Sequence, residues 1–186
     1  MNLKFEIQNL MMEDVKIITP FYMEDDRGYF LKSFEKELFR SLGLQIDIYE
    51  DFESYSKKNV LRGLHFQICQ PQKKLVRVIK GEIHDVIVDL RKNSKTFGKS
   101  MDIILSEDIH NMLWIPAGFA HGFEVLSTEA IMSYKCFGKY LKEYDSGIRW
   151  NDADLSIQWQ TSKPILSEKD AALMSFQEFK EHYFGL

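Results

Sequence analysis

Short apolar segments separated by turn residues fill the chain from residue 44 to about residue 160, and this pattern limits the possible folds more than any other feature. Glycines such as Gly81 and Gly98, or short polar stretches, separate segments rich in β-branched and aromatic residues, as is typical of an all-β sandwich or barrel. No helical pattern alternates with these segments, which disfavours a parallel sheet of strand–helix–strand units. The eight predicted strands are residues 46–52, 60–67, 74–79, 82–90, 99–105, 111–115, 119–126 and 130–137.

Helices are predicted only outside this β-rich region. Residues 34–42 have the spacing of a short amphipathic helix, and Gly43 follows as its stop. Towards the C-terminus, Ser167 has the position of an N-cap, and Ser175 opens a second capping box before a helix that stops at Gly185. We therefore expect an all-β core with a short N-terminal helix and C-terminal helices.

Length, charge and cysteine content exclude several classes of protein. A chain of 186 residues favours one domain, residues 1–186. It has 24 basic and 28 acidic residues and no basic block, so no nucleic-acid partner is expected. No apolar run approaches the about 18 residues of a membrane span, and residues 1–7 lack a signal-peptide core. We expect Cys69 and Cys136 to be free thiols in a cytoplasmic protein that binds no membrane.

Two histidines lie in strand-like apolar segments beside glycines. His65 follows Arg62 and Gly63, and His121 has a glycine on each side within three residues. A buried histidine near an arginine suits proton transfer on an anionic substrate. Either histidine alone is equally compatible with a core imidazole that is hydrogen-bonded by the backbone. Strict strand alternation would put Arg62 and His65 on opposite faces, whereas a bulge at Gly63 would bring both to one side.

Four other residues have both a structural and a functional interpretation. Lys74 lies on the apolar face of a predicted strand. A lysine in such a position most often extends its ammonium group to the solvent. Alternatively, it is held in place to stabilise a negative charge that forms during a reaction. Tyr134 is either a packing residue or a general acid. Asp170 is the third residue of a capping box, or it orients a histidine and raises the pKa of that base. Residues 1–30 show short apolar alternations and a turn in which Gly28 leaves Arg27 either exposed or aimed at a fixed partner.

A metal site is the main alternative to acid–base chemistry by side chains alone. A β-barrel with scattered histidines and glutamates can hold iron, manganese or zinc. However, His65 has no histidine two residues later, because position 67 is Gln67, and His84 lies on an apolar strand face where packing is the expected role. The sequence therefore predicts no metal and no cofactor, with a metal-dependent enzyme as the alternative. The five histidines are His65, His84, His110, His121 and His182.

Seven motifs together resemble the dTDP-4-dehydrorhamnose 3,5-epimerase family in order and spacing, from about residue 14 to residue 175. The resemblance implies a cupin-like jelly-roll barrel, a homodimer and catalysis without metal. It also implies a nucleotide-linked 4-keto-6-deoxy sugar as substrate, made for a surface polysaccharide or a glycosylated product. The motifs are Arg62-Gly-Leu-His-Phe-Gln67, Lys74-Leu-Val-Arg-Val78, Asp89-Leu-Arg91, Trp114-Ile-Pro-Ala-Gly-Phe-Ala-His-Gly-Phe123, Tyr134-Lys-Cys136, Gly147-Ile-Arg-Trp-Asn-Asp152 and Leu166-Ser-Glu-Lys-Asp170.

The resemblance also implies roles for these residues. The C4 ketone of such a sugar acidifies the hydrogens on C3 and C5, and inversion proceeds through an enolate. His65 would be the base with Asp170 as its partner, Lys74 would stabilise the enolate oxygen, and Tyr134 would donate a proton from the opposite face. We expect inversion at both carbons. The residues expected to contact the substrate are Arg27, Arg62, Gln67, His121, Tyr140 and Lys169.

Four further binding positions depart from the family pattern. Glu50 and Phe52 stand where the family has glutamine and asparagine at the nucleotide end, and Lys32 and Asp145 stand where it has glutamate. We therefore expect the nucleotide end to differ from the thymidine-linked pattern, with a GDP-linked or different 4-keto sugar as an alternative substrate. Inversion at C3 alone, a metal-dependent cupin enzyme and a non-catalytic sugar-nucleotide-binding cupin also stay open at this point.

Overall fold

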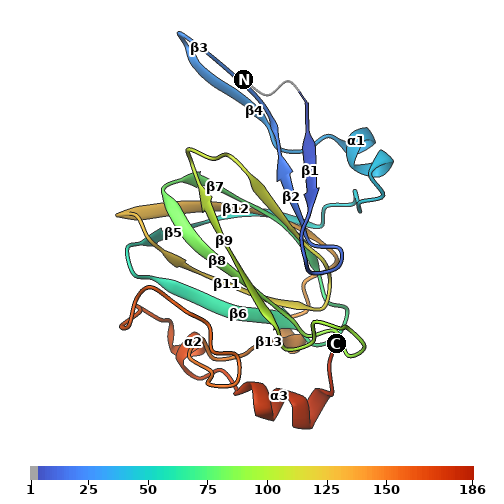
Figure 1. Cartoon of the computed structure of the whole chain (residues 1–186), viewed down its shortest axis with the longest axis vertical. Helices are drawn as coiled ribbons and strands as arrows, with labels where there is room; N and C mark the ends of the chain where they lie inside the picture. The colour runs from blue at the N-terminus through green and yellow to red at the C-terminus, as the bar shows by residue number, and fades with distance from the viewer. Residues whose placement is uncertain (1–3) are drawn as a thin grey trace.

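The computed structural model describes residues 4–186, and residues 1–3 of the segment considered for a signal peptide lie outside it. Its strands are β1 (Glu6–Asn9), β2 (Lys16–Thr19), β3 (Phe21–Asp25), β4 (Gly28–Lys32), β5 (Glu50–Lys57), β6 (Leu61–Gln67), β7 (Lys73–Lys80), β8 (Glu82–Asp89), β9 (Ser100–Ser106), β10 (Met112–Ile115), β11 (Phe119–Val125), β12 (Glu129–Phe137) and β13 (Asp145–Gly147). They form a six-stranded sheet of order β1-β2-β10-β7-β12-β5, a five-stranded sheet of order β13-β6-β11-β8-β9, and the β3–β4 hairpin. The two large sheets pack face to face (Figure 1).

All eight predicted strands are present, as β5 to β12, and they confirm the all-β jelly-roll prediction. The largest difference is at β5, which runs on to Lys57 because it pairs with β12 along its whole length, from Glu50 opposite Cys136 to Lys57 opposite Glu129. The polar residues of this edge strand hide it from an apolar pattern. In the described chain, no strand pairing joins the edges of the two large sheets, so they do not close into a barrel.

The β8 strand shows why the central segments are almost continuously apolar. Its side chains alternate between two buried layers. Ile83 and Ile87 point into the core between the two sheets, whereas Val86 and Val88 pack under the C-terminal segment on the outer face. Because both faces of the five-stranded sheet are covered, the usual apolar–polar alternation of an antiparallel strand is lost.

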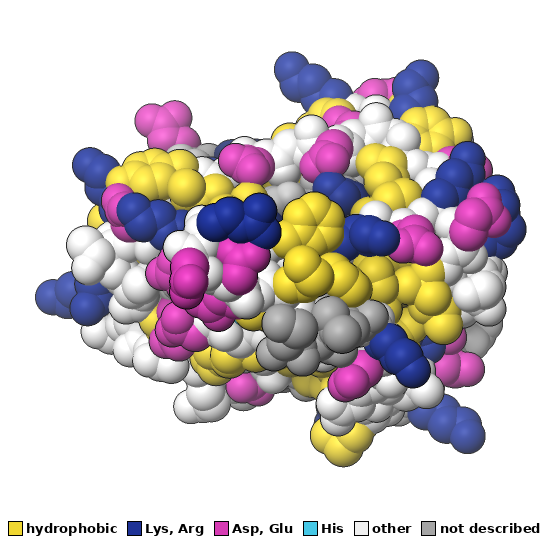
Figure 2. Space-filling view, turned by 90° about the horizontal axis from the view of Figure 1, so that it is seen from above, with side chains coloured by type: hydrophobic (Ala, Val, Ile, Leu, Met, Phe, Trp, Pro, Cys, Tyr) yellow, Lys and Arg dark blue, Asp and Glu magenta, His cyan; other side chains and the backbone are white. Residues whose placement is uncertain are grey.

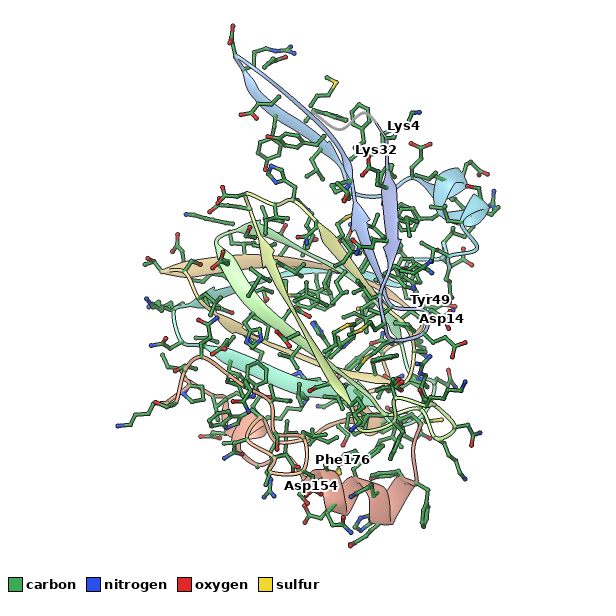
Figure 3. The ribbon with its side chains drawn as sticks, viewed as in Figure 1. Lys4, Asp14, Lys32, Tyr49, Asp154 and Phe176 are labelled. Carbon is green, nitrogen blue, oxygen red and sulfur yellow. The ribbon has the colours of Figure 1, made fainter. Side chains whose placement is uncertain are left out.

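Short helices flank the sheets as predicted. Ser167 accepts a hydrogen bond from the N–H of Asp170, and Ser175 forms the predicted capping box with Glu178. The last helix covers the outer face of the five-stranded sheet, with Phe176 at its start beneath the sheets (Figure 3). This helix ends one residue before Phe184, which takes a left-handed φ of 55° ahead of the predicted stop. The helices are α1 (Lys36–Ser41), α2 (Glu168–Ala171) and α3 (Phe176–Tyr183), and none in residues 4–186 is long and apolar enough to cross a membrane.

The β3–β4 hairpin projects beyond the two sheets at the end opposite α3 (Figure 1). Its base is fixed by Tyr22, whose ring stacks on His110 with a centroid distance of 4.3 Å. Tyr29 and Phe30 of β4 are 53% and 55% exposed. As neighbours in a strand they point to opposite faces of the hairpin, and the Tyr29 ring lies 5.6 Å from that of His110. Seen from this end, apolar side chains gather in the middle of the molecule, with charged side chains around them (Figure 2). The hairpin therefore leaves aromatic surface exposed beyond the two sheets.

Candidate active site

A cavity of about 410 Å³ opens between the two sheets, and it collects most of the predicted site residues. The strands β5, β6, β7, β11 and β12 supply most of its wall. Asp170 lies behind His65 and touches the cavity only through it. The predicted residues that line the cavity are Glu50, Phe52, Arg62, His65, Gln67, Lys74, His121, Tyr134, Tyr140, Asp145 and Lys169.

His65 and Asp170 form a hydrogen-bonded pair at the cavity wall. The His65 Nε2 atom lies 2.5 Å from Asp170 Oδ1, and the side chains are 32% and 5% exposed. Because an ionised carboxylate can only accept, Nε2 carries the hydrogen and Nδ1 is the nitrogen left to take a proton. Burial raises the pKa of Asp170, but hydrogen bonds and charge from His65 outweigh it and bring this pKa below its ordinary value. Asp170 also takes part in the helix cap, where its backbone N–H donates to the Ser167 hydroxyl at 3.0 Å, while its catalytic role stays a prediction.

Gly63 forms the predicted irregularity in β6. The pairing of β6 with β11 shifts register between His121 and Phe123, and Gly63 has a φ of 124°. A Cβ atom at this position would lie 2.5 Å from the Cα atom of Gly122, so only glycine fits here. Arg62 consequently reaches the mouth of the cavity, where its Nε donates to the Ser56 hydroxyl at 2.9 Å.

Lys74 lines the cavity, so it does not extend to solvent as an isolated lysine on a strand commonly does. Burial lowers the pKa of its ammonium group, and nearby acidic groups offset only part of this effect. Cys136 lies on the neighbouring strand, and burial raises the pKa of its thiol to about 11. The sequence analysis predicted a free thiol at Cys136 but did not include it in the site; both cysteines of the chain are free.

Tyr134 is the buried hydroxyl of the cavity. Its ring stacks on Phe52 with centroids 4.7 Å apart, and its hydroxyl lies 3.4 Å from the Ser54 hydroxyl. Burial raises the pKa of Tyr134 well above its ordinary value, although the Ser54 hydrogen bond lowers it slightly. The phenol therefore keeps its proton at neutral pH.

His121 faces the same cavity and has its own carboxylate partner, which the sequence analysis missed. Its Nε2 atom lies 2.8 Å from Asp85 Oδ2, and Asp85 is completely buried. In the pairing of β6 with β11, His121 lies opposite His65. The one available signal was the position of Asp85 between Ile83 and Ile87, because an acidic residue on an inward strand face needs a partner.

Polar contacts at the mouth hold the cavity rim. Asp145 accepts hydrogen bonds from Tyr140 at 2.9 Å and from Lys169 at 2.5 Å. The side-chain amide of Gln67 donates to the carbonyl oxygens of residues 69, 70 and 139. Glu50 accepts from Gln72 at 3.1 Å. Much of the hydrogen-bonding capacity of Gln67 thus serves the loops around the cavity.

Two predicted binding residues lie outside the cavity of their own chain. Arg27 is at the tip of the β3–β4 hairpin and pairs with Asp25 at 2.5 Å, while its side chain is 87% exposed. Lys32 is at the base of the same hairpin, pairs with Glu35 at 2.7 Å, and lies at the upper end of the molecule (Figure 3). Their contact with substrate stays a prediction.

His84 forms a further buried pair on the outer face of the five-stranded sheet, in addition to the packing expected for it. Its Nδ1 atom lies 2.9 Å from Glu124, which also accepts hydrogen bonds from the backbone N–H groups of Gln160 and Thr161. Within residues 4–186 no group of three or more histidine, cysteine or acidic side chains is placed to hold a metal ion.

Comparison with known proteins identifies the family. The sequence profile of the dTDP-4-dehydrorhamnose 3,5-epimerase family matches residues 9–178. The chain belongs to this family. The Escherichia coli dTDP-4-dehydrorhamnose 3,5-epimerase is 49% identical over 170 residues, covering 90% of this chain and 92% of the relative. The Methanothermobacter thermautotrophicus dTDP-4-dehydrorhamnose 3,5-epimerase is 48% identical over 170 residues, with the same two coverages.

A solved structure of a dTDP-6-deoxy-D-glucose-3,5-epimerase from Legionella pneumophila, in complex with dTDP-4-keto-L-rhamnose, has the same fold. The two chains are 42% identical with a TM-score of 0.89, over 92% of this chain and 93% of that one. These likenesses confirm the predicted family and the cupin-like jelly roll of the dTDP-4-dehydrorhamnose 3,5-epimerases.

Proposed function

We propose that this chain is an isomerase that inverts C3 and C5 of a nucleotide-linked 4-keto-6-deoxy sugar, converting dTDP-4-dehydro-6-deoxy-D-glucose to dTDP-4-dehydro-L-rhamnose. The observation that carries the proposal is the His65–Asp170 pair at the wall of a cavity that also contains Lys74 and Tyr134. A base, a cation and a buried acid are the three groups that an enolate mechanism needs.

Each of these groups has a distinct step. His65 takes the hydrogen from the carbon beside the C4 ketone through Nδ1, and Asp170 stabilises the imidazolium that results. The electron pair moves onto the C4 oxygen, where the ammonium group of Lys74, which lines the cavity, stabilises the enolate. Tyr134, still protonated because burial raises its pKa, returns a proton from the opposite face and inverts the carbon. His65 serves C3 and C5 in turn after a small movement of the sugar ring, once it has released the first proton to the solvent. At the more open carbon the enolate takes its proton from water, and Tyr134, which donates at the more enclosed carbon, recovers its own from the solvent.

The arginine and the rim residues suit the nucleotide part of the substrate. Arg62 at the cavity mouth has the forked donor geometry that binds a pyrophosphate through two bonds at once. Its Nε already donates to Ser56, so its orientation is fixed before the substrate arrives. His121, Tyr140 and Lys169 complete the proposed binding surface.

The proposal includes a cytoplasmic homodimer. Arg27 and Lys32 lie away from their own cavity, and the hairpin between them exposes Tyr29 and Phe30. A second copy of the chain that covers this aromatic surface would receive both cations at its cavity. The free thiols of the chain suit a reducing compartment.

Mixing two inactive variants tests the dimer. His65→Asn removes the base of one chain, and Arg27→Ala removes the hairpin cation of the other. If the hairpin serves the partner's cavity, mixed dimers contain one complete site and activity returns when the variants are combined. A chain that elutes as a monomer, with no recovery on mixing, contradicts this part of the proposal.

The reaction itself is tested by incubating the purified chain with dTDP-4-dehydro-6-deoxy-D-glucose and following the sugar signals by NMR. Signals of the inverted sugar are expected, and they should be lost with His65→Asn. A wild-type chain that binds the sugar nucleotide without changing it contradicts the enzyme proposal and favours a binding protein.

The nucleobase is tested separately, since Glu50, Phe52 and Lys32 depart from the thymidine-linked pattern. Glu50 and Phe52 both line the cavity. Thermal-shift titrations with dTDP, UDP and GDP rank the nucleotides, because a tighter ligand stabilises the folded state more. If dTDP stabilises the protein most, the proposed substrate is supported and the departures at Glu50, Phe52 and Lys32 do not change the nucleotide preference. If GDP stabilises it most, the substrate is instead the GDP-linked sugar.

A further inference from the structure

The β3–β4 hairpin projects from the molecule, yet the proposed function needs its tip in a fixed place. In residues 4–186 neither β3 nor β4 pairs with a strand of the two large sheets. An isolated two-stranded hairpin is at best marginally stable in water. Arg27 stands at the turn of this hairpin, and its side chain is 87% exposed. Contacts between the hairpin and the body of the molecule must therefore set the direction in which the tip points.

His110 supplies such contacts. It lies in the turn between β9 and β10, where the chain crosses from the five-stranded to the six-stranded sheet. Its imidazole stacks on the Tyr22 ring, with centroids 4.3 Å apart and an interplanar angle of 29°, and it lies 5.6 Å from the Tyr29 ring. The two tyrosine rings are also 5.6 Å apart. We call Tyr22, Tyr29 and His110 the ring cluster.

The register of the hairpin explains why both tyrosines reach the same histidine. Tyr22 pairs with Leu31, and Tyr29 pairs with Glu24. Residues opposite each other in an antiparallel pair point to the same face, as do residues two apart in one strand, so the tyrosines share a face. Phe30 lies on the opposite face and is 55% exposed. One face of the hairpin is thus turned towards the β9–β10 turn, and the other is left open.

The β9–β10 turn is itself anchored to the buried end of β9. The N–H of Ile109 donates to the Ser106 hydroxyl, and the N–H of His110 donates to the Ser106 carbonyl oxygen, both at 3.2 Å. Ser106 is buried. His110 has a left-handed φ of 59°, a conformation that histidine adopts more often than most residues other than glycine. The imidazole is therefore presented to the hairpin from a fixed backbone.

We propose that His110 is a positioning residue for the reaction, which holds the β3–β4 hairpin through the ring cluster and so fixes where Arg27 meets the cavity of a second copy of the chain. The inference rests on the proposed function, in which the hairpin serves the partner's cavity. His110 acts through the hairpin and does not touch the substrate. A hairpin that points in the binding-competent direction only part of the time binds with an affinity reduced by that fraction. Loss of the ring cluster should therefore weaken substrate binding and spare the chemical step.

Four variants test the ring cluster. His110→Asn removes the imidazole but keeps a residue that tolerates a positive φ. Tyr22→Leu removes the ring on the hairpin side, whereas Tyr22→Phe keeps that ring and loses only the hydroxyl. Ile109→Ala is the matched control, because Ile109 is 52% exposed in the same turn and contributes no ring.

The direct measurement is hydrogen–deuterium exchange of residues 21–32, followed by mass spectrometry. Exchange should be about 3–10-fold faster in His110→Asn and in Tyr22→Leu, as expected for the loss of an aromatic pair. It should stay at the wild-type rate in Tyr22→Phe and in Ile109→Ala.

Steady-state kinetics connect the hairpin to the reaction. In His110→Asn and Tyr22→Leu, KM should rise about 2–5-fold while kcat stays within about twofold of wild type. On an Arg27→Ala background, His110→Asn should raise KM less than it does in the wild-type background, because both changes remove the same contact with the substrate.

Wild-type exchange in both His110→Asn and Tyr22→Leu overturns the inference, and so does equal acceleration in Ile109→Ala, which would reflect a general loosening of the turn. Faster exchange with an unchanged KM, or a KM effect fully additive with Arg27→Ala, also overturns it and leaves the ring cluster a structural feature. If His110→Asn does not fold, the comparison of Tyr22→Leu with Tyr22→Phe decides. A wild-type chain that changes no 4-keto sugar defeats the proposed function. Exchange and the Kd of the same variants for dTDP then still decide the role of His110.

Discussion

The two faces of the five-stranded sheet carry the same kind of side-chain pair in different surroundings. On the inner face, His121 pairs with Asp85 beside a cavity, and one oxygen of the acid is unpaired. On the outer face, His84 pairs with Glu124, whose oxygens also hold the backbone of residues 160 and 161. Both pairs join β8 to β11. A buried histidine–carboxylate pair can therefore serve either catalysis or structure. Which of the two it serves depends on what the remaining polar atoms of the pair face.

This comparison predicts that substitutions on the two faces affect different properties. Substitutions of residues that face the cavity should lower turnover while the protein stays folded. Substitutions of residues under the C-terminal segment should lower the free energy of unfolding while turnover stays normal. His65 and Asp170 extend the inner set, since they reach the same cavity from β6 and α2.

The largest effect is expected for His65→Asn. Asparagine keeps a polar side chain of similar size but cannot act as a base, so solvent deuterium uptake into the sugar should fall by about 10²–10⁴-fold. Substrate should still bind, which a thermal-shift titration measures alongside the exchange rate. Exchange at the wild-type rate would remove His65 from the mechanism and leave its pair with Asp170 as a structural feature.

Asp170→Asn should give a smaller loss of rate, about tenfold or more, because the imidazole keeps its place but loses the charge that stabilises its protonated form. Stability adds a second readout. The pKa of Asp170 is lowered in the folded protein, so its contribution is present above the unfolded value of about 3.9 and disappears as the pH falls through the folded value. The variant should thus be less stable than wild type at pH 7, with the gap closing below about pH 4. A lower melting temperature with unchanged turnover would leave only the helix-capping role.

Glu124→Gln tests the outer face. Loss of the carboxylate weakens its bonds to His84 and to two backbone N–H groups, and the expected cost is about 1–3 kcal/mol of the free energy of unfolding. For a protein of this size each kcal/mol lowers Tm by about 2–4 °C. The kcat value should stay within twofold of wild type. A large loss of kcat at a normal Tm would show that the two faces are not separated as described.

The smallest effect is expected from metal removal. Gln67 stands in place of a second metal-binding histidine, and its side-chain nitrogen is engaged by backbone carbonyls. Dialysis against a chelator should leave turnover unchanged, with zinc, manganese and iron added back in parallel. Loss of activity that one of these ions restores would favour a metal-dependent cupin enzyme.

Local patterns predicted the parts of the molecule that local interactions determine. The N-cap at Ser167 and the capping box at Ser175 depend on residues three positions apart, and the bulge at Gly63 follows from the conflict between Arg62 and His65 in one strand. The Asp85–His121 pair was missed because its members are 36 residues apart and meet only when β8 and β11 pair. Polar β5 was underestimated for a similar reason, since its partner β12 lies about 80 residues away in sequence. Arg27 lies outside its own cavity because the β3–β4 hairpin projects away from it, and the direction of that projection cannot be predicted from the spacing of residues in the sequence.

The central claim is that one base, His65, acts on both carbons beside the ketone and that Tyr134 returns the proton at the more enclosed one. NMR of the sugar nucleotide turned over by wild type in deuterated water tests it most directly. The account predicts deuterium at both C3 and C5, and in Tyr134→Phe it predicts label at C3 with loss of inversion at C5. Label at C3 alone with the wild-type protein would contradict double inversion and reduce Tyr134 to a part of the cavity wall.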